Sequence, residues 1–510
     1  MNPTANLTPA LVLAAIAMLA WGLIRARRQG KAGLLAWLQS LALLLPWLIF
    51  LGLFATNIYL GAAGFVLLLA ISTGIYIGVG RLAREVAREE QDARKSFEAQ
   101  FKSEAVPPTA KADVEADTPV AAEGAAVSEA GDASLERRRS RISAEDLAAI
   151  QSIFGIDTFY VTETLPYGDG AIFQGNLRQE AALAVARLQE NLRQAVGDRY
   201  WLYLVYDPTD RPAVVVLPDA TVNSATPPSV AALAGVLFVA SSLAVMELAA
   251  NVSGFSLGSA PQRWLETLPF ASAIIGIVVL HEWGHRWMAA QYGVRLSPAF
   301  LVPTLGLGTL GSLNRIESPV PSRQGLFDIA IAGPALGFVL SLLFAIVGLW
   351  LSGHPGDIFL PSSILKYSIL MGALSKAILG SQLQAEVVGL HPLVLVGWMG
   401  LVINALSLLP AGQLDGGRIV QAVYGRKMAR RATFVTIALL CLAAFSNQIA
   451  LYWGLLVILV ARDGERPPQD EITETDGQRD ALALLALFLM AMTLLPIAPT
   501  LAGQFGLGAL

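Results

Sequence analysis

The chain has 510 residues, of which 55% are hydrophobic and only 15% are charged, and its formal net charge is -4. Soluble domains rarely reach so apolar a composition, and the small net charge gives no indication of a nucleic-acid partner. The single cysteine, Cys441, excludes a disulfide framework and argues against a thiolate zinc site. We predict an all-α polytopic membrane protein with about 8–10 spans, a re-entrant loop and a small cytoplasmic α+β domain.

Residues 1–80 are predicted to form N-terminal membrane helices. The first apolar segment, 9–24, precedes a cluster of arginines and lysines that we expect to face the cytoplasm, and this order is the reverse of a signal peptide. The apolar residues 34–80 suffice for about two spans. Residues 81–140 begin as a charged helix and continue as a disordered tether, because they are rich in Ala, Glu, Ser and Pro and poor in aromatic residues.

Order is expected to resume in a cytoplasmic α+β domain at residues 141–222. Ser143, with Asp146 three residues later, is a typical helix start. Hydrophobic periodicity predicts helices and strands in the following order: a helix to 154, strands at 158–164 and 171–177, a helix at 179–196, and strands at 200–206 and 213–217.

The membrane core is predicted at residues 229–465, followed by a polar loop and a C-terminal membrane helix at 466–510. Residues 297–314 are apolar but punctuated by glycine and proline, so we expect a re-entrant loop there, which at membrane depth must line a cavity or be buried. The other expected segments are spans at 230–250, 269–290, 325–353 and 393–409, a marginal segment at 362–380, and a tight hairpin at 432–461.

The stretch His281-Glu282-Trp283-Gly284-His285 carries the H-E-x-x-H pattern inside an apolar run. Helical residues four apart share a face, so His281 and His285 can offer two nitrogens to one Zn²⁺ while Glu282 acts as general base. Ionisable groups at membrane depth are costly unless they are paired, bound to metal or exposed to a cavity. The pattern therefore predicts a zinc site.

Catalytic zinc takes three protein ligands and a water, so a third ligand is required. His354 and His391 are expected near the outer ends of their segments, far from the motif, whereas Asp415 follows a span broken by Pro410 and glycines. Broken helices at membrane depth often mark binding sites, and Asp415 is the favoured third ligand. A different zinc protease class would use a carboxylate near Asp328 or Glu317.

Together, H-E-x-x-H and Pro410-x-x-x-Leu414-Asp415-Gly416 resemble the motifs of the site-2 protease family of intramembrane zinc metalloproteases. The resemblance implies that His281, His285 and Asp415 hold zinc and that Glu282 activates water. It also implies cleavage of transmembrane segments of membrane proteins in the lipid bilayer, as in regulated intramembrane proteolysis.

The family pattern has Asn three residues before the proline, where this chain has Ser407. Asn404 lies one turn earlier and shares that face, so Asn404 and Ser407 are candidate substrate contacts, with interhelical hydrogen bonding as the alternative for Asn404. Gly308, in the glycine-rich stretch, is a third candidate, because an unwound substrate can be held by edge pairing.

The segment Gly175-Asn176-Leu177-Arg178 resembles a G-N-L-R motif of the chloroplast and cyanobacterial branch, known as ethylene-dependent gravitropism-deficient and yellow-green. This branch implies a bacterial inner or thylakoid-type membrane, and the predicted topology puts the active site towards the cytoplasmic side. Two other function classes stay open at this point: a transporter or channel, since broken helices also serve ion pathways, and a catalytically inactive membrane scaffold.

Overall fold

The computed structural model describes residues 142–219, 228–304, 308–458 and 464–497, apart from 168, 208, 355 and 446, and a few isolated residues between 23 and 82. The chain divides into two units, residues 1–126 and 127–510. All elements given below belong to the second unit. The predicted N-terminal membrane helices and the tether fall almost entirely outside the described residues.

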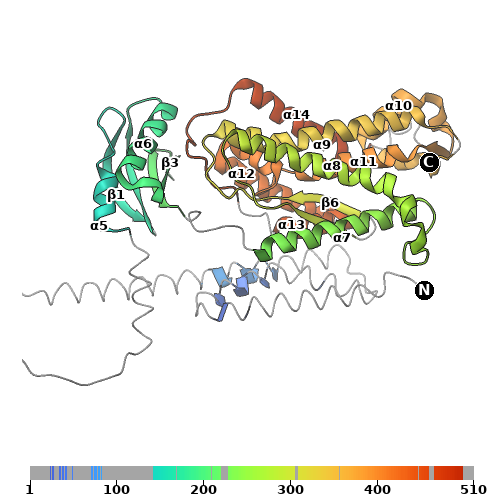
Figure 1. The fold of residues 1–510 in the computed structure, drawn as a ribbon, viewed down its shortest axis with the longest axis horizontal. Coiled ribbons are helices and arrows are strands. Elements are labelled where there is room, and N and C mark those ends of the chain that lie inside the picture. The colour runs from blue at the N-terminus through green and yellow to red at the C-terminus, as the bar shows by residue number, and fades with distance from the viewer. Residues whose placement is uncertain are drawn as a thin grey trace, which may run out of the picture. The chain divides into compact units, whose positions relative to one another are not determined.

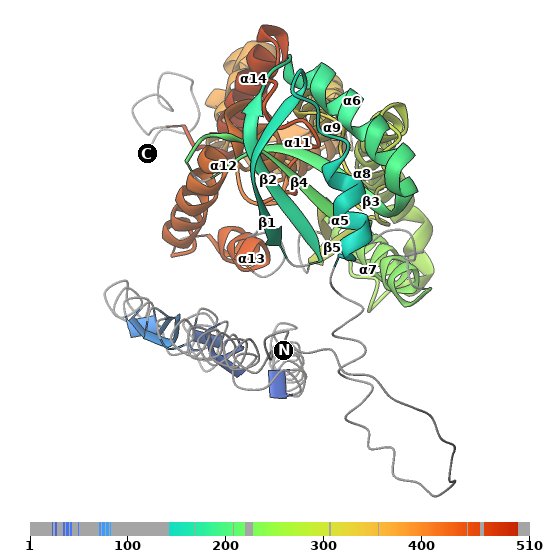
Figure 2. The same cartoon turned by 90° about the vertical axis from the view of Figure 1, so that its left-hand side faces the viewer.

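The predicted α+β domain is confirmed, with element bounds within a few residues of those expected. Its antiparallel sheet has the strand order β1-β2-β4-β3, and Figure 2 shows the sheet with its two helices. Ser143 caps the first helix, its Oγ accepting a hydrogen bond from the Asp146 amide at 2.9 Å. The elements are α5 (Ala144–Gln151), β1 (Phe159–Tyr167), β2 (Gly170–Leu177), α6 (Ala181–Val196), η2 (Gly197–Arg199), β3 (Tyr200–Tyr206) and β4 (Pro212–Pro218).

The G-N-L-R motif lies at the end of β2, where its glycine is needed for packing. A Cβ at Gly175 would lie 2.1 Å from the carbonyl oxygen of Tyr160 on the neighbouring strand. The pairing of β1 with β2 shifts register between Val161 and Glu163, so Gly175 permits the close approach of the strands beside this bulge.

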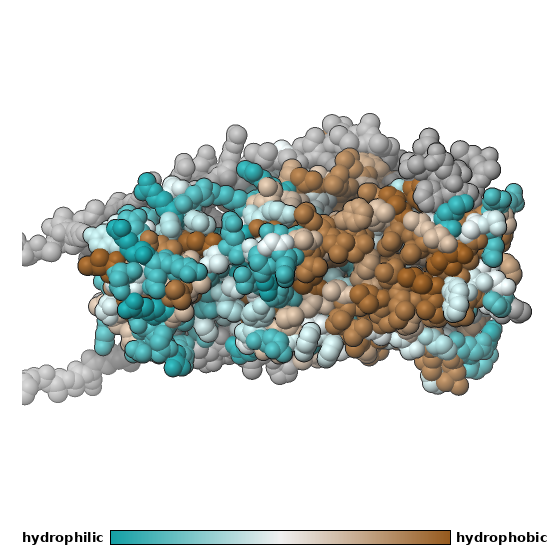
Figure 3. Space-filling model, turned by 90° about the horizontal axis from the view of Figure 1, so that it is seen from above, coloured by the Kyte–Doolittle hydropathy of each residue, from teal (hydrophilic) through white to brown (hydrophobic). Residues whose placement is uncertain are grey.

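The membrane part of the chain is helical, which confirms the predicted fold class. Among the described residues, four helices are long and apolar enough to cross a bilayer, and a shorter apolar helix accompanies them. Figure 1 shows these helices, and Figure 3 shows a broad apolar surface on one face of the helical part. They are α7 (Pro228–Val252), α8 (Trp264–Gln291), α9 (Arg323–Leu351) and α14 (Gly477–Leu494), with α11 (Pro392–Ser407) as the shorter helix.

The segment predicted as a re-entrant loop folds as a β-hairpin. Strands β5 (Phe300–Thr304) and β6 (Gly308–Leu313) pair antiparallel with a register shift between Leu301 and Pro303. The strand pair itself was not predicted, because glycine and proline are depleted in strands. Gly308 adopts a positive φ of +78° within β6. The intervening residues 305–307 lie outside the described chain.

The first turn of a long helix begins at Asp415, where the sequence indicated only a broken span. Helix α12 runs over Asp415–Ala443 with one non-helical residue, Gly425. Helix α13 (Gln448–Leu456) follows, as the predicted hairpin requires. The remaining elements are η3 (Pro261–Arg263), β7 (Ile358–Pro361), η4 (Ser362–Tyr367), α10 (Ile369–Leu379), η5 (Gly380–Gln384) and β8 (Val387–Leu390).

The polar loop before α14 has an ordered backbone that joins two parts of the second unit. The Leu204 amide in β3 donates to the Gln469 carbonyl at 2.7 Å, and the Glu471 amide donates to the Leu204 carbonyl at 3.0 Å. On its other side, the Gln469 amide donates to Val320 at 2.8 Å, just before α9. The edge of the α+β sheet is therefore attached to the chain segment that begins α9.

Candidate metal centre

Two histidines of α8 and one aspartate of α12 converge on a single point. The Nε2 atoms of His281 and His285 lie 3.1 Å apart. The Asp415 carboxylate lies 3.3 Å from His281 Nε2 and 3.4 Å from His285 Nε2. Within the part of the chain that the structure describes, this is the one group of His, Cys, Asp or Glu side chains suited to hold a metal ion, and all three members are buried.

The donor set fits zinc. Tetrahedral ligands at about 2.0–2.1 Å from Zn²⁺ lie about 3.3 Å from one another, close to the three separations observed here. Each histidine hydrogen-bonds through its Nδ1 atom, His281 to Asn404 Oδ1 and His285 to the Ile329 carbonyl, both at 2.7 Å. Because both partners accept, Nδ1 carries the proton and Nε2 keeps its lone pair for a metal.

The Asn404 amide has a fixed orientation. Its Nδ2 donates to the Gly400 carbonyl one turn earlier at 2.8 Å, so its Oδ1 must face His281. The side chain is fully buried. Ser407 is buried as well, and its hydroxyl donates to the Asn404 carbonyl at 2.9 Å.

Helix α9 passes close behind the site through two glycines. A Cβ at Gly333 would lie 2.2 Å from His285 Nε2, and one at Gly337 would lie 2.2 Å from Asn404 Oδ1. Glycines four residues apart on one helix face permit close packing of a neighbouring helix. In the structure, Gly333 approaches His285, a candidate ligand, and Gly337 approaches Asn404, the side chain that orients His281.

The segment that carries Asp415 is held by its own helix. The Gly412 amide donates to Thr433 Oγ1 at 2.8 Å, and the Thr436 hydroxyl donates to the Pro410 carbonyl at 3.2 Å. A Cβ at Gly416 would come within 1.9 Å of the Leu408 carbonyl oxygen, so only glycine lets the first turn of α12 pack there.

Glu282 is buried beside the histidines and contacts the hairpin. Its Oε2 accepts from Asn314 Nδ2 at 3.1 Å, and the Ser312 hydroxyl is 3.5 Å away. Its Oε1 lies 3.0 Å from an Arg286 nitrogen, an ion pair one helical turn along α8, yet this oxygen accepts no hydrogen bond from a described residue.

The rival ligands lie elsewhere. His354 is exposed, with its ring 2.9 Å from the Leu351 carbonyl, and His391 caps α11 by accepting the Leu393 amide at 3.2 Å. Asp328 is bound by Arg479, with nitrogen to oxygen distances of 2.7 and 2.8 Å. Neither histidine, nor Asp328 or Glu317, belongs to the metal group.

Three residues near Glu282 were not identified from the sequence: Asn314, Arg418 and Glu465. Arg418 and Glu465 form a buried ion pair at 2.9 Å, and Arg418 also donates to Asn314. The signal available was weak, namely an arginine among the apolar residues after Asp415 and an asparagine at the end of the glycine-rich stretch.

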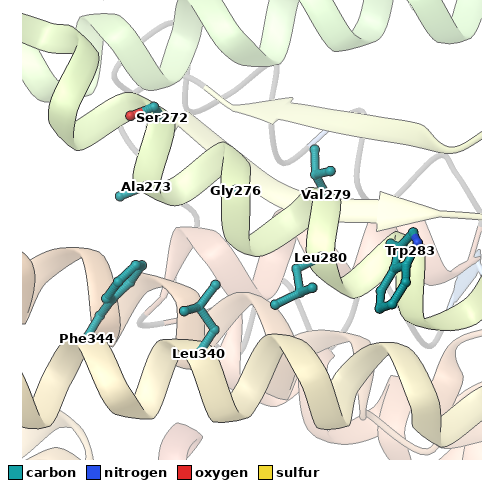
Figure 4. A pocket seen from close by; sticks show the side chains of 8 residues that line it. All are labelled: Ser272, Ala273, Gly276, Val279, Leu280, Trp283, Leu340 and Phe344. Carbon is teal, nitrogen blue, oxygen red and sulfur yellow. The ribbon is translucent and has the colours of Figure 1, made fainter.

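A groove of about 530 Å³ lies between α8 and α9 on the other side of the zinc motif. Figure 4 shows its apolar lining, including Val279 and Trp283 from α8 and Phe344 from α9. Val279 and Trp283 are exposed, whereas His281 and His285 are buried. The groove is therefore separate from the metal centre.

The sequence of the chain is similar to those of known proteins. Residues 269–446 match the model of peptidase family M50, and residues 148–225 match the EGY3 middle domain. The probable zinc metalloprotease EGY1, chloroplastic, of Arabidopsis thaliana is 33% identical over 393 residues, 70% of this chain and 72% of that protein. The chain belongs to peptidase family M50.

Within M50 the chain lies in the EGY branch. The rice (Oryza sativa subsp. japonica) EGY1 is 32% identical over 407 residues, covering 72% of this chain and 70% of that protein. The Arabidopsis EGY2 is 34% identical over 351 residues, covering 68% of this chain but only 63% of that protein. No solved structure matches the chain.

Peptidase family M50 is the site-2 protease family. Membership in it therefore confirms the predicted family, the peptidase class and the zinc cofactor. The EGY3 middle-domain match overlaps the α+β domain predicted at 141–222. The match to peptidase family M50 and the four candidate spans together identify the chain as a multi-pass membrane protein.

Proposed function

We propose that this chain is an intramembrane zinc metalloprotease that hydrolyses peptide bonds in transmembrane segments of membrane proteins. The observation that carries the proposal is the buried His281, His285 and Asp415 group, whose helix α8 is itself a candidate span. Hydrolysis at such a site takes place among membrane helices, where the peptide bonds within reach belong to other membrane segments.

Each residue has a role in the proposed reaction. His281, His285 and Asp415 hold the zinc ion. Bound zinc supplies a water of lowered pKa and polarises the scissile carbonyl. The Glu282 carboxylate takes the proton of the attacking water and delivers it to the departing amine nitrogen.

Strand β6 offers a way to hold an unwound substrate. In the described chain it pairs only with β5, so its other edge has no strand partner, as pairing with an added strand requires. Its end lies at Glu282, through the contacts of Ser312 and Asn314. A substrate strand paired with β6 would pass the general base.

Asn404 and Ser407 have a different role in this proposal from direct substrate contact. Both are buried, and the Asn404 amide is occupied by His281 and by the Gly400 carbonyl. We assign Asn404 to orienting His281, and Ser407 to supporting the end of α11.

The charge pattern of the sequence supports a side of the membrane for the active site. Basic residues after the first apolar segments favour a cytoplasmic α+β domain and an active site towards the same side. The relatives are named chloroplastic, which supports a thylakoid-type or bacterial inner membrane for this chain.

The test is zinc content and cleavage of a single-span model substrate in detergent, compared among the parent, Glu282→Gln and Asp415→Ala. We expect Glu282→Gln to keep zinc and lose cleavage, and Asp415→Ala to lose both. Glu266→Gln, an exposed carboxylate at the start of α8, is the matched control and should behave as the parent. A parent that bound no zinc and did not cleave would leave a transporter or an inactive scaffold as the better account, whereas a Glu282→Gln variant that cleaved normally would rule out Glu282 as the general base.

A further inference from the structure

A line of buried polar side chains extends from Glu282 through Asn314 and Arg418 to Glu465. We propose that Asn314, with its amide oriented by Arg418, is the positioning residue that holds the Glu282 carboxylate for proton transfer. The inference deepens the proposed function and rests on it.

The contact between Asn314 and Glu282 joins two separate elements. Glu282 belongs to α8, and Asn314 follows the last residue of β6. Asn314 Nδ2 lies 3.1 Å from Glu282 Oε2, and the two residues are 9% and 8% exposed. A hydrogen bond to a carboxylate is roughly twice as strong as one between neutral groups, and burial strengthens it further.

Arg418 decides which end of the Asn314 amide faces Glu282. One guanidinium nitrogen donates to Asn314 Oδ1 at 2.8 Å and another donates to the Asn314 backbone carbonyl at 2.8 Å. Arginine has five donors and no acceptor, so the amide oxygen must face Arg418. The amide NH₂ group must then face Glu282, as a donor.

Arg418 is itself fixed on its far side. It is 1% exposed, and its Nε donates to Glu465 Oε2 at 2.9 Å. Gln421 holds that segment by donating to the Glu465 carbonyl at 3.0 Å. A buried arginine paired in this way is costly to disturb, because removal of one partner leaves an uncompensated charge.

The position of Arg418 in the chain links the base to the metal ligands. Arg418 lies three residues after Asp415 in the first turn of α12, with a nitrogen 3.6 Å from the Asp415 carboxylate. One helical turn therefore supplies both a zinc ligand and the anchor of the general base. The spacing between Glu282 and the ligands is set by this turn and by the hairpin that ends at Asn314.

The arrangement leaves one carboxylate oxygen for chemistry. Oε2 is held by Asn314, while Oε1 is ion-paired with Arg286 but accepts no hydrogen bond from a described residue. A general base needs one oxygen within reach of the proton that it removes. Oε1 is therefore the oxygen that Asn314 leaves available for this task.

The sharpest test is Asn314→Asp, which keeps the shape of the side chain and the acceptor for Arg418 but replaces the N–H donor with an oxygen facing Glu282. Misplacement of a catalytic group by about 1 Å can cost about 100-fold in rate, so we expect kcat to fall about 10- to 100-fold. The KM for the model substrate and the zinc content should stay at the parent values. The thermal midpoint in detergent should fall modestly, because a second buried carboxylate then faces Glu282 while the Arg418 contact is kept.

Asn314→Ala serves as a second variant and should lower kcat as well, with a lower thermal midpoint because Arg418 loses an acceptor. Asn176→Asp, the same substitution at an exposed position of β2, is the control. A parent that does not cleave would overturn the proposed function. A parent that cleaves, with Asn314→Asp equal to it in kcat, would overturn only the positioning role, as would loss of zinc from Asn314→Asp.

Discussion

Gly333 of α9 lies against the imidazole of His285, so closely that a Cβ at position 333 would be 2.2 Å from Nε2. Nε2 is the nitrogen that faces His281 and Asp415. A helix with no side chain at this point therefore forms the wall of the metal centre.

Gly333→Ala should abolish zinc binding, and cleavage with it, because a methyl group cannot share the space of the ligand nitrogen. Zinc measured after gel filtration should fall to a small fraction of the parent value. Gly276→Ala is the matched control, since a Cβ at this glycine of α8 meets nothing within 4 Å. If Gly333→Ala retained zinc, the close contact would have no bearing on the site.

Asn404→Ala should weaken zinc binding by about 10- to 100-fold, the usual effect of removing a side chain that orients a ligand histidine. The affinity can be measured by competition with a chelator. Ser407→Ala removes only a hydroxyl bonded to the carbonyl of Asn404 itself and should bind zinc as the parent does. The alternative role for Asn404, direct contact with substrate, predicts a raised KM with unchanged zinc affinity.

The sequence predicted those parts of the site that depend on local spacing. His281 and His285 share a helical face at any position in a fold, and Asp415 was found because proline and glycine broke its segment. Asn314 and Glu465, and the contact of Gly333 with His285, could not be found in this way. Their roles arise where α9, the β5–β6 hairpin and the loop before α14 meet α8 and α12, and no periodicity within one segment encodes such a meeting.

The same distinction, between local sequence patterns and contacts among distant segments, applies to the fold. Alternating and helical periodicity located the strands and helices of the α+β domain, since each buries one face. The hairpin was expected to be a loop because its glycines and prolines obscure the strand pattern. Residue 308 adopts φ +78° in β6, and a Cβ there would be 2.7 Å from a Val245 methyl group of α7. Contact with α7, rather than propensity, accounts for this glycine.

Gly308→Pro should impair cleavage while zinc stays bound. Proline fixes φ near about -65°, which conflicts with +78° and distorts β6, whereas the three zinc ligands lie on α8 and α12. Cleavage and zinc content should be measured on the same preparation. Gly254→Pro imposes the same conflict, at φ +80° in the loop after α7, and is expected to cleave normally. Unchanged cleavage by Gly308→Pro would count against a role for β6 in holding substrate.

The α+β domain should lose stability as the pH falls, through Asp146. Burial raises the pKa of this carboxyl, but hydrogen bonds from Arg199 and Tyr200 outweigh burial and hold the pKa below its ordinary value. A group with a lowered pKa in the folded state stabilises the fold above its unfolded pKa, about 3.9, and this contribution disappears as the pH falls through the folded value.

The suitable measurement is amide hydrogen exchange of residues 144–151 in the full-length protein, corrected for intrinsic rates. It should span about pH 2 to about pH 5, because the contribution of Asp146 is lost below its unfolded pKa of about 3.9. Protection should fall towards the acid end in the parent and depend less on pH in Asp146→Asn, which starts from lower protection because Arg199 loses its ion pair. Glu145→Gln removes an exposed carboxylate from the same turn and should follow the parent. Equal pH dependence in the parent and in Asp146→Asn would show that other carboxyls govern the acid stability of this helix.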